Sequence, residues 1–269
     1  MFTTQNNGTA NIPFADKEKK PPTLTDLATI AEWIREADSI VAFTGAGIST
    51  ESGIPDFRSP GGIWSKSTPV YYDEFVRYPE SRYEYWRQKS IAHREFADAQ
   101  PNVGHTVLAD WETAGRLNGV VTQNIDGLHQ AAGSRQVLEL HGTARYVACL
   151  ECEARFDVDP WVLYFQERDE VPPCPECGNW LKHATVSFGQ ALPREVLSGS
   201  MELARGADLF FAIGSSLVVE PAASLPRLAK ESGGRLVIIN RDSTDQDRSA
   251  DAVIHASIGE TLAAIDKLL

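Results

Sequence analysis

Six short apolar runs, each ending at glycine or a polar residue, occur along this chain of 269 residues. They lie at residues 39–44, 119–122, 137–140, 209–213, 236–239 and 252–254. Most are separated by segments with apolar residues at helical spacing, such as Leu27, Ile30 and Ile34. Continuous apolar strands alternating with amphipathic helices are typical of a mostly parallel sheet with helices on both faces. The sequence therefore predicts an α/β fold.

Polar or glycine-rich clusters directly follow most of these runs. They begin at Gly45, Gln123, His141, Gly214 and Asn240. In open parallel sheets, ligands bind in the crevice outside the carboxyl ends of the strands. We therefore expect the clusters to meet at one ligand-binding crevice.

Two segments interrupt the alternation of strands and helices. Residues 61–100 are dense in aromatic and charged side chains, which indicates a small helical module, and residues 144–183 contain all four cysteines. Residues 1–22 are rich in Asn, Thr, Lys and Pro, so we expect a disordered leader there. The predicted architecture is a Rossmann-like parallel-sheet domain, formed by residues 23–60, 101–143 and 184–269, with the helical module and a small zinc-ribbon domain inserted.

The cysteines form two pairs, Cys149-x2-Cys152 and Cys174-x2-Cys177, with 21 residues between the pairs. This spacing is typical of a zinc ribbon, in which two knuckles supply four thiolates to one tetrahedral ion. No protein ligand position stays open for water, so we expect one structural Zn²⁺ per chain. The alternative is two disulfides, which an apparently cytoplasmic chain disfavours.

Acidic residues outnumber basic ones by 37 to 25, which gives a net charge of -12. Direct nucleic-acid binding is therefore not expected. An acidic surface suits encounter with basic protein segments, although solubility explains the same charge equally well. No apolar run approaches the length of a membrane span and no secretory signal is present, so we expect a cytoplasmic protein without membrane contact.

The first glycine cluster, Gly45-Ala46-Gly47-Ile48-Ser49-Thr50, has two glycines of a dinucleotide-binding fingerprint but threonine at the third glycine position. It also lacks an acidic ribose-binding residue about 20 positions further on. Taken alone, the cluster indicates a tight turn as readily as a phosphate-binding loop.

The longer run at 45–59, GAGISTESGIPDFRS, closely resembles the signature loop of the sirtuins, the NAD-dependent protein deacylases. Further motifs follow in the order of that family and extend the resemblance over roughly residues 25–269. They are Gln123-Asn124-Ile125-Asp126, Leu140-His141-Gly142, the cysteine pairs, Phe188-Gly189, Gly214-Ser215-Ser216 and Ile239-Asn240.

The resemblance implies an NAD site and a role for most of its residues. Ala46, Gly47 and Arg58 would bind the pyrophosphate, and Phe57 would cover the reactive sugar. Gln123 would hold the nicotinamide ribose, while Ser215, Asn240 and the backbone at Ile258 would hold the adenosine half. The complete implied NAD site is Gly45, Ala46, Gly47, Ser49, Asp56, Phe57, Arg58, Gln123, Asn124, Ile125, Asp126, Gly214, Ser215, Ser216, Asn240 and Ile258.

Three of these motifs imply catalytic residues. Asn124 would place the sugar and a water, Asp126 would accept the nicotinamide carboxamide, and His141 would be the general base. The acyl oxygen of the substrate itself attacks the ribose, so no protein nucleophile is required. An imidazole with an ordinary pKa near 6.5 suits removal of a ribose proton at neutral pH. Without the resemblance, Asn124 and Asp126 would be interpreted as turn formers.

The acyl-peptide site also resembles that of the sirtuins. Val186 and Phe188 would line the lysine tunnel, and the substrate backbone would add as a strand between two flanking segments. The flanking residues are Gly189, Gln190 and Ala191 on one side and Val218, Val219 and Glu220 on the other. Gln190 departs from the family, which usually has glutamate there, and this puts local substrate preference in doubt.

The helical module bears on which acyl group is removed. Sirtuins that remove acidic acyl groups resemble one another in a tyrosine and an arginine, three residues apart, that bind the acyl carboxylate. Alignment on the turn at 78–80 puts Trp86 and Lys89 at these positions. Lysine lacks the bidentate fork of arginine, so this assignment predicts a preference for neutral acyl groups. Alternatively, Trp86 packs in the core of the module.

The expected function is therefore that of an NAD-dependent protein deacylase acting on acylated-lysine proteins or peptides. One alternative is a mono-ADP-ribosyltransferase or NAD glycohydrolase on the same scaffold. Another is a catalytically silent NAD-sensing adaptor. The presence of both Asn124 and His141 favours the deacylase.

Overall fold

The computed structural model describes residues 24–56, 62 and 68–269. The predicted leader at 1–22 lies outside these residues. The larger sheet of the described chain has six strands in the order β3-β2-β1-β7-β8-β9, and every neighbouring pair is parallel. Its strands are β1 Ile40–Thr44, β2 Gly119–Thr122, β3 Val137–Glu139, β7 Leu209–Ile213, β8 Arg235–Ile239 and β9 Ala252–Ile254. The predicted parallel sheet is confirmed.

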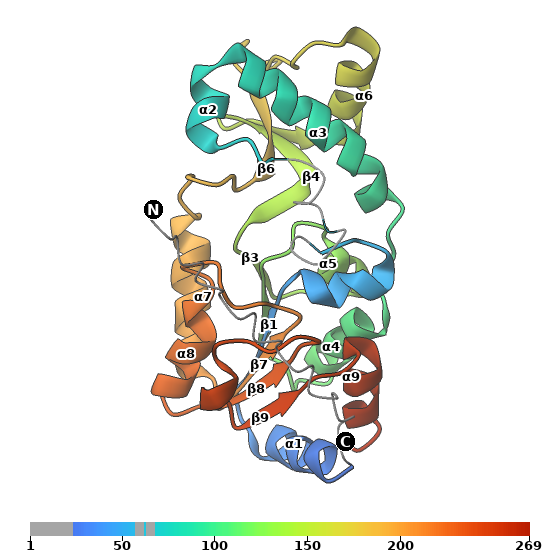
Figure 1. Ribbon diagram of the computed structural model, residues 1–269, viewed down its shortest axis with the longest axis vertical. Coiled ribbons are helices and arrows are strands. Elements are labelled where there is room, and N and C mark those ends of the chain that lie inside the picture. The colour runs from blue at the N-terminus through green and yellow to red at the C-terminus, as the bar shows by residue number, and fades with distance from the viewer. Residues whose placement is uncertain (1–23, 57–61, 63–67) are drawn as a thin grey trace, which may run out of the picture.

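Helices cover both faces of this sheet (Figure 1). On one face lie α1 Leu24–Glu36, α4 Val103–Thr113 and α9 Ile258–Asp266, and on the other lie α7 Arg194–Gly206 and α8 Ser224–Glu231. Alternate residues of β1 pack into two different apolar clusters. Ile40 and Ala42 belong to the cluster under α1, α4 and α9, and Val41 and Phe43 belong to the cluster under α7 and α8. Because both faces are buried, the central strands are continuously apolar in sequence.

A second, three-stranded antiparallel sheet lies above the first in Figure 1. It consists of β4 Gly142–Cys149, β5 Arg155–Asp157 and β6 Leu181–Thr185. Three helices pack with this sheet: α2 Tyr72–Arg77, α3 Pro79–Ala97 and α6 Asp159–Arg168. Phe75, Trp86, Val147, Phe165 and Leu181 share one apolar core there. The helices of residues 61–100 and the cysteine-bearing segment therefore pack as one unit.

Polar contacts reinforce this shared core. The Trp86 indole Nε1 donates to the Leu181 carbonyl oxygen at 2.9 Å. Arg82 is buried, donates to the carbonyl oxygens of Phe75 and Val76, and holds its guanidinium 4.6 Å from the Trp180 ring centroid. The position of α3 thus depends on β6 and on the residue just before it.

Three short helical elements complete the described chain: η1 Ala46–Ser52, α5 Leu128–Ala132 and η3 Asp247–Ser249. Both η1 and α5 begin shortly after a strand of the larger sheet, which brings their first residues to its carboxyl edge. None of the helices that the structure describes is both long and apolar enough to span a bilayer.

Candidate active site

A cavity of about 950 Å³ lies at the carboxyl edge of the larger sheet and extends to α3 and β6. The first residues of all five predicted clusters line it: Gly45, Gln123, His141, Gly214 and Asn240. The expected convergence on one crevice is therefore confirmed. This volume is at the upper end of the range for small-molecule and cofactor sites.

Close backbone packing explains the glycines at its floor. Gly45 N donates to Ile213 O at 2.9 Å, and Gly47 N donates to Gly214 O at 2.8 Å. A Cβ atom on Gly47 would lie 2.7 Å from the Gly214 Cα, and one on Gly214, whose φ is +64°, would lie 2.5 Å from Ile48 N. Side chains at these positions would push the loops after β1 and β7 apart. Ala46 and Ser216 also line the cavity.

A buried polar network lies behind the part of the cavity wall that Asn124 and Ile125 form. Ser49 Oγ donates to Asp126 Oδ2 at 2.7 Å and accepts from Asn124 Nδ2 at 3.0 Å. Asp126 Oδ1 accepts at 2.9 Å from the backbone N of Leu128, the first residue of α5. Asn124 and Ile125 line the cavity, whereas Ser49 and Asp126 do not. In this structure the two latter residues hold the Asn124 amide in place.

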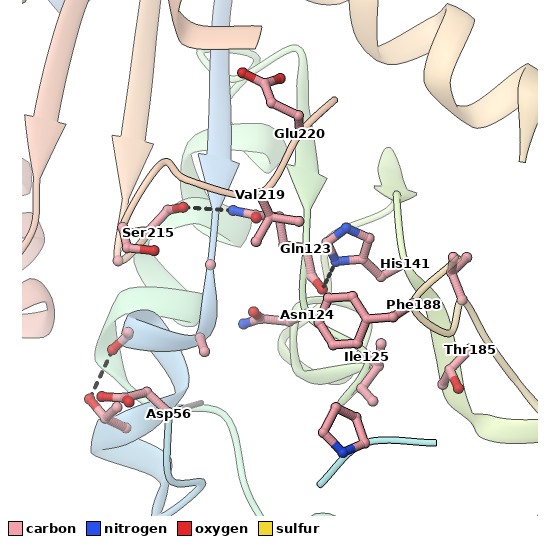
Figure 2. Close-up of a pocket in the computed structure, with 18 of the residues that line it drawn as sticks. Asp56, Gln123, Asn124, Ile125, His141, Thr185, Phe188, Ser215, Val219 and Glu220 are labelled. Carbon is pink, nitrogen blue, oxygen red and sulfur yellow. Dashed lines mark hydrogen bonds between the residues drawn. The ribbon is translucent and has the colours of Figure 1, made fainter. Parts of the chain in front are cut away.

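His141 lies between β3 and β4, and in Figure 2 its ring is above Asn124, Ile125 and Phe188. Its Nδ1 lies 2.9 Å from the Gln123 carbonyl oxygen. A carbonyl can only accept, so Nδ1 carries the proton and Nε2 keeps a free lone pair. Burial lowers the pKa of His141, and the hydrogen bond to Gln123 opposes this in part. The imidazole is therefore predominantly neutral at pH 7.

The opposite end of the cavity is organised around Ser215. Gln123 Nε2 donates to Ser215 Oγ at 2.7 Å, which fixes the side-chain amide across the loops after β2 and β7 (Figure 2). Asn240 lines the same wall and donates through Nδ2 to Asp242 O at 2.7 Å. Ile258 begins α9 and also lines the cavity.

Glu51 connects this wall to the glycine loop. Its Oε1 accepts from Ser257 Oγ and Gly259 N, both at 3.1 Å, so one carboxylate ties η1 to the first turn of α9. Glu51 is not among the site residues predicted from the sequence. No spacing signal could reveal it, because its partners lie more than 200 positions away.

The segment after β6 forms another wall. Val186 N donates to the His141 carbonyl at 2.8 Å, and Phe188, 37% exposed, has its ring centroid 5.8 Å from that of Tyr71. Gln190 closes its own turn: its Oε1 accepts from Ser187 N at 3.1 Å. A glutamate would offer the same acceptor, so Gln190 preserves the turn and removes one negative charge.

The flanking segment at 218–220 contributes unevenly to the cavity. Val219 and Glu220 line it, together with Gly189 and Ala191 from the other side. Val218 is 54% exposed and does not line the cavity.

The prediction that Trp86 lines the acyl tunnel is wrong. Trp86 is fully buried in the shared core, with its ring centroid 6.0 Å from Phe165 and 4.9 Å from His183. One residue step rotates a helix by about 100°, so the neighbouring residue faces the cavity instead. Tyr85, Gln88 and Lys89 are the α3 residues at this wall. The alternative, that Trp86 packs in a core, is confirmed, so only Lys89 of the two assigned residues lies at the cavity wall.

The four cysteines form a separate cluster within the shared unit. Their Sγ atoms all lie within 4.8 Å of one another, with 3.4 Å between Cys149 and Cys177 and 3.7 Å between Cys152 and Cys174. Four thiolates about 2.3 Å from a tetrahedral Zn²⁺ would be about 3.8 Å apart, whereas a disulfide requires about 2.05 Å. The donor set and its geometry fit a structural zinc ion.

Comparison with known proteins identifies the family. The Sir2 family model matches residues 45–221. The chain belongs to the Sir2 family. An NAD-dependent protein deacetylase of Rhodopseudomonas palustris is 50% identical over 245 residues, covering 90% of this chain and 96% of the relative. NAD-dependent protein deacetylase 1 of Bradyrhizobium diazoefficiens is 51% identical, with 87% and 92% covered.

Solved Sir2 structures share the fold. One containing a p53 peptide and NAD⁺ has a TM-score of 0.79 at 37% identity, covering 89% of this chain and 96% of that chain. Another, a Sir2 variant with a deacetylated p53 peptide and 3'-O-acetyl ADP ribose, has a TM-score of 0.82 at 36% identity, with 90% and 98% covered.

Part of the Sir2 signature loop lies outside the described residues, including the predicted site residues Phe57 and Arg58. Asp56, the last residue before them, lines the cavity and lies 3.7 Å from the Arg241 guanidinium. Arg241, which was not predicted from the sequence, also lines the cavity next to Asn240.

Proposed function

We propose that this Sir2 family chain is an NAD-dependent protein-lysine deacylase, with acetyl-lysine among its substrates. It releases nicotinamide, the free lysine and an O-acyl-ADP-ribose. The observation that carries the proposal is the neutral His141 imidazole, which is fixed through Nδ1 and faces one cavity with the glycine loop and Asn124. The names of its relatives support the same activity.

NAD supplies an ADP-ribosyl group whose bond to nicotinamide is broken. The backbone at Gly45, Ala46 and Gly47 would approach the pyrophosphate, in a loop whose path depends on the close packing of Gly45 and Gly47 against Gly214. Gln123 would orient the nicotinamide ribose, and its bond to Ser215 keeps the amide at the junction of the two NAD halves. Asn240 and the backbone at Ile258 would hold the adenosine end, with Arg58 and Phe57 acting from the signature loop.

Asn124 would place the reactive sugar and a water. The hydrogen bond to Ser49 leaves the Asn124 side-chain oxygen available to the cavity. Asp126 supports this placement through Ser49 and retains carboxylate lone pairs for the nicotinamide carboxamide.

His141 would take the proton from a ribose hydroxyl at Nε2 and return it later in the reaction. Burial keeps the imidazole neutral, so the base is ready at physiological pH. The Val186 backbone, which donates to the His141 carbonyl, joins the base to the wall that would line the lysine tunnel. Phe188 would form the other side of that tunnel.

The partner would be an acylated-lysine protein or peptide, bound as an added strand between residues 189–191 and 218–220. The net charge of -12 favours basic segments over nucleic acid. A cytoplasmic location belongs to the same proposal, because four zinc-binding thiolates persist best in a reducing compartment.

Incubation with NAD and an acetyl-lysine peptide, followed by mass spectrometry, tests the proposal. We expect nicotinamide, deacetylated peptide and O-acetyl-ADP-ribose in equal amounts. Nicotinamide with free ADP-ribose and intact peptide would identify an NAD glycohydrolase instead. Mass added to a protein as ADP-ribose would identify a transferase, and no consumption of NAD would identify a silent NAD-binding protein.

A further inference from the structure

Glu51 is an acid in the cavity wall that the proposed chemistry does not use. It lies on η1, is exposed and lines the cavity. Its Oε1 accepts from Ser257 Oγ and from Gly259 N, both at 3.1 Å. Both donors are neutral, so they hold the carboxylate in place without cancelling its charge. Within the described part of the chain, no Lys, Arg or His forms an ion pair with Glu51.

The carboxylate lies at the first turn of α9, which would otherwise attract an anion. The first N–H groups of a helix have no partner within the helix, and the helix dipole favours negative charge there. Ser257, at the N-cap, forms no side-chain cap and donates to Glu51 instead. Gly259 leaves room for the carboxylate, because a Cβ atom there would overlap Glu51 Oε2. Glu51 therefore takes the place at which a phosphate would bind to α9.

Contacts between loops place Glu51 at the adenosine end of the cavity. His255 Nδ1 lies 2.9 Å from the Asn240 carbonyl oxygen, so the segment that leads into α9 is joined to the loop after β8. Asn240, Ser257 and Ile258 line the cavity together with Glu51. Asn240 and the backbone at Ile258 are the groups expected to hold the adenosine half of NAD. A substituent on the adenosine ribose would therefore lie close to the Glu51 carboxylate.

The other charged groups at this end do not offset Glu51. Arg241, next to Asn240, is the cation of this end among the residues that the structure describes. Its guanidinium lies 3.7 Å from the Asp56 carboxylate and 3.3 Å from that of Asp242, and both acids also line the cavity. With Glu51, three carboxylates accompany one guanidinium. The described part of the adenosine end is therefore negative in balance and unsuited to an additional phosphate.

We infer that Glu51 makes this chain select NAD over NADP, because its carboxylate repels the phosphate that NADP carries on the adenosine ribose. The inference rests on the proposed function and adds the residue that sets the choice of cofactor. Asn240 favours the same choice. Its Nδ2 donates to Asp242 O, and its side-chain oxygen can accept from a ribose hydroxyl. A phosphate dianion in place of that hydroxyl has no proton to donate.

The test measures the binding of ADP-ribose and of 2'-phospho-ADP-ribose by calorimetry. Both ligands lack nicotinamide, so binding is measured without turnover. The parent, Glu51→Gln and Glu260→Gln are compared. Glutamine keeps an oxygen acceptor for Ser257 and Gly259 and removes only the charge. Glu260, which is exposed in the first turn of α9 and does not line the cavity, is the matched control for the loss of one negative charge.

We expect the parent to bind ADP-ribose at least about tenfold more tightly than 2'-phospho-ADP-ribose, the scale of one like-charge contact near a protein surface. Glu51→Gln should reduce this preference by about tenfold, mainly through tighter binding of the phosphorylated ligand. Glu260→Gln should leave the preference unchanged. The preference of the parent should also shrink as sodium chloride is added, because salt screens exposed charges. The ratio of kcat/KM for NAD to that for NADP, measured with acetyl peptide, should change in parallel.

Three results would overturn the inference while leaving the proposed function intact. The parent could bind the two ligands alike, Glu51→Gln could keep the full preference of the parent, or the preference could be the same at low and high salt. Failure to bind ADP-ribose, or to remove acetyl from the peptide with NAD, would instead contradict the proposed function.

Discussion

The Nδ1 of His141 lies 2.9 Å from the backbone carbonyl oxygen of Gln123, and this one contact sets the tautomer of the imidazole. The protonated nitrogen faces the protein, and Nε2 is free to accept a proton from a ligand in the cavity. Because Gln123 also binds Ser215, the same residue links the base to the opposite end of the cavity.

Replacing the base should separate binding from catalysis. We expect His141→Ala to bind NAD nearly as well as the parent but to deacetylate about a hundredfold or more slowly, the usual scale for loss of a general base. Nicotinamide exchange should be less affected, because the base acts after nicotinamide departure. His93→Ala, whose ring contacts Asp159 outside the cavity wall, is the control. A His141→Ala enzyme with the parent deacetylation rate would contradict the assignment.

The dependence of activity on pH should reflect the protonation of the His141 imidazole. Burial lowers the His141 pKa below its usual 6.5, and the active form is the neutral one. Activity should therefore be retained as the pH falls to 6.5 and be lost only as the pH passes through the lower pKa. Measurement of kcat/KM for acetyl peptide against pH tests this, since that parameter reports groups of the free enzyme. An acid limb at or above pH 6.5 would count against it.

The buried hydrogen bonds among Ser49, Asn124 and Asp126 should matter for both stability and activity. In Asp126→Asn, an amide replaces the carboxylate that accepts from Ser49 Oγ, so one buried hydrogen bond to a charged group is lost. We expect a loss of about 1.5–3 kcal/mol in the free energy of unfolding, and a fall of about tenfold or more in kcat/KM as Asn124 loses its support. Denaturant unfolding and acetyl-peptide kinetics measure the two effects. Asp110→Asn, on the exposed side of α4, serves as the control.

Sequence reasoning could predict the parallel sheet because its central strands are buried on both faces and therefore consist of uninterrupted apolar residues. It could predict the convergence at Gly45, Gln123 and His141 because each follows a strand of that sheet. The side of α3 that faces the cavity was not predictable. Tyr85 and Trp86 are both aromatic and both buried, and only the packing of α3 on β6 decides which one lines the cavity.

Zinc removal should affect more than the cysteine-bearing segment. Thiolate coordination supplies folding energy to a segment whose own sheet has three strands. That segment shares its core with α3 through the contacts of Trp86 with Leu181 and of Arg82 with Trp180. We therefore expect chelation to raise amide hydrogen exchange in β4, β6 and α3 together, while β1 and β7 stay protected by their own clusters. Deacetylation should be lost, because Tyr85, Thr185 and Val186 no longer hold the cavity wall next to His141.

Metal analysis of the untreated protein should give one zinc per chain. Soluble, active protein without zinc, or exchange confined to residues 144–183 with α3 unchanged, would show that the two segments do not depend on the metal as one unit.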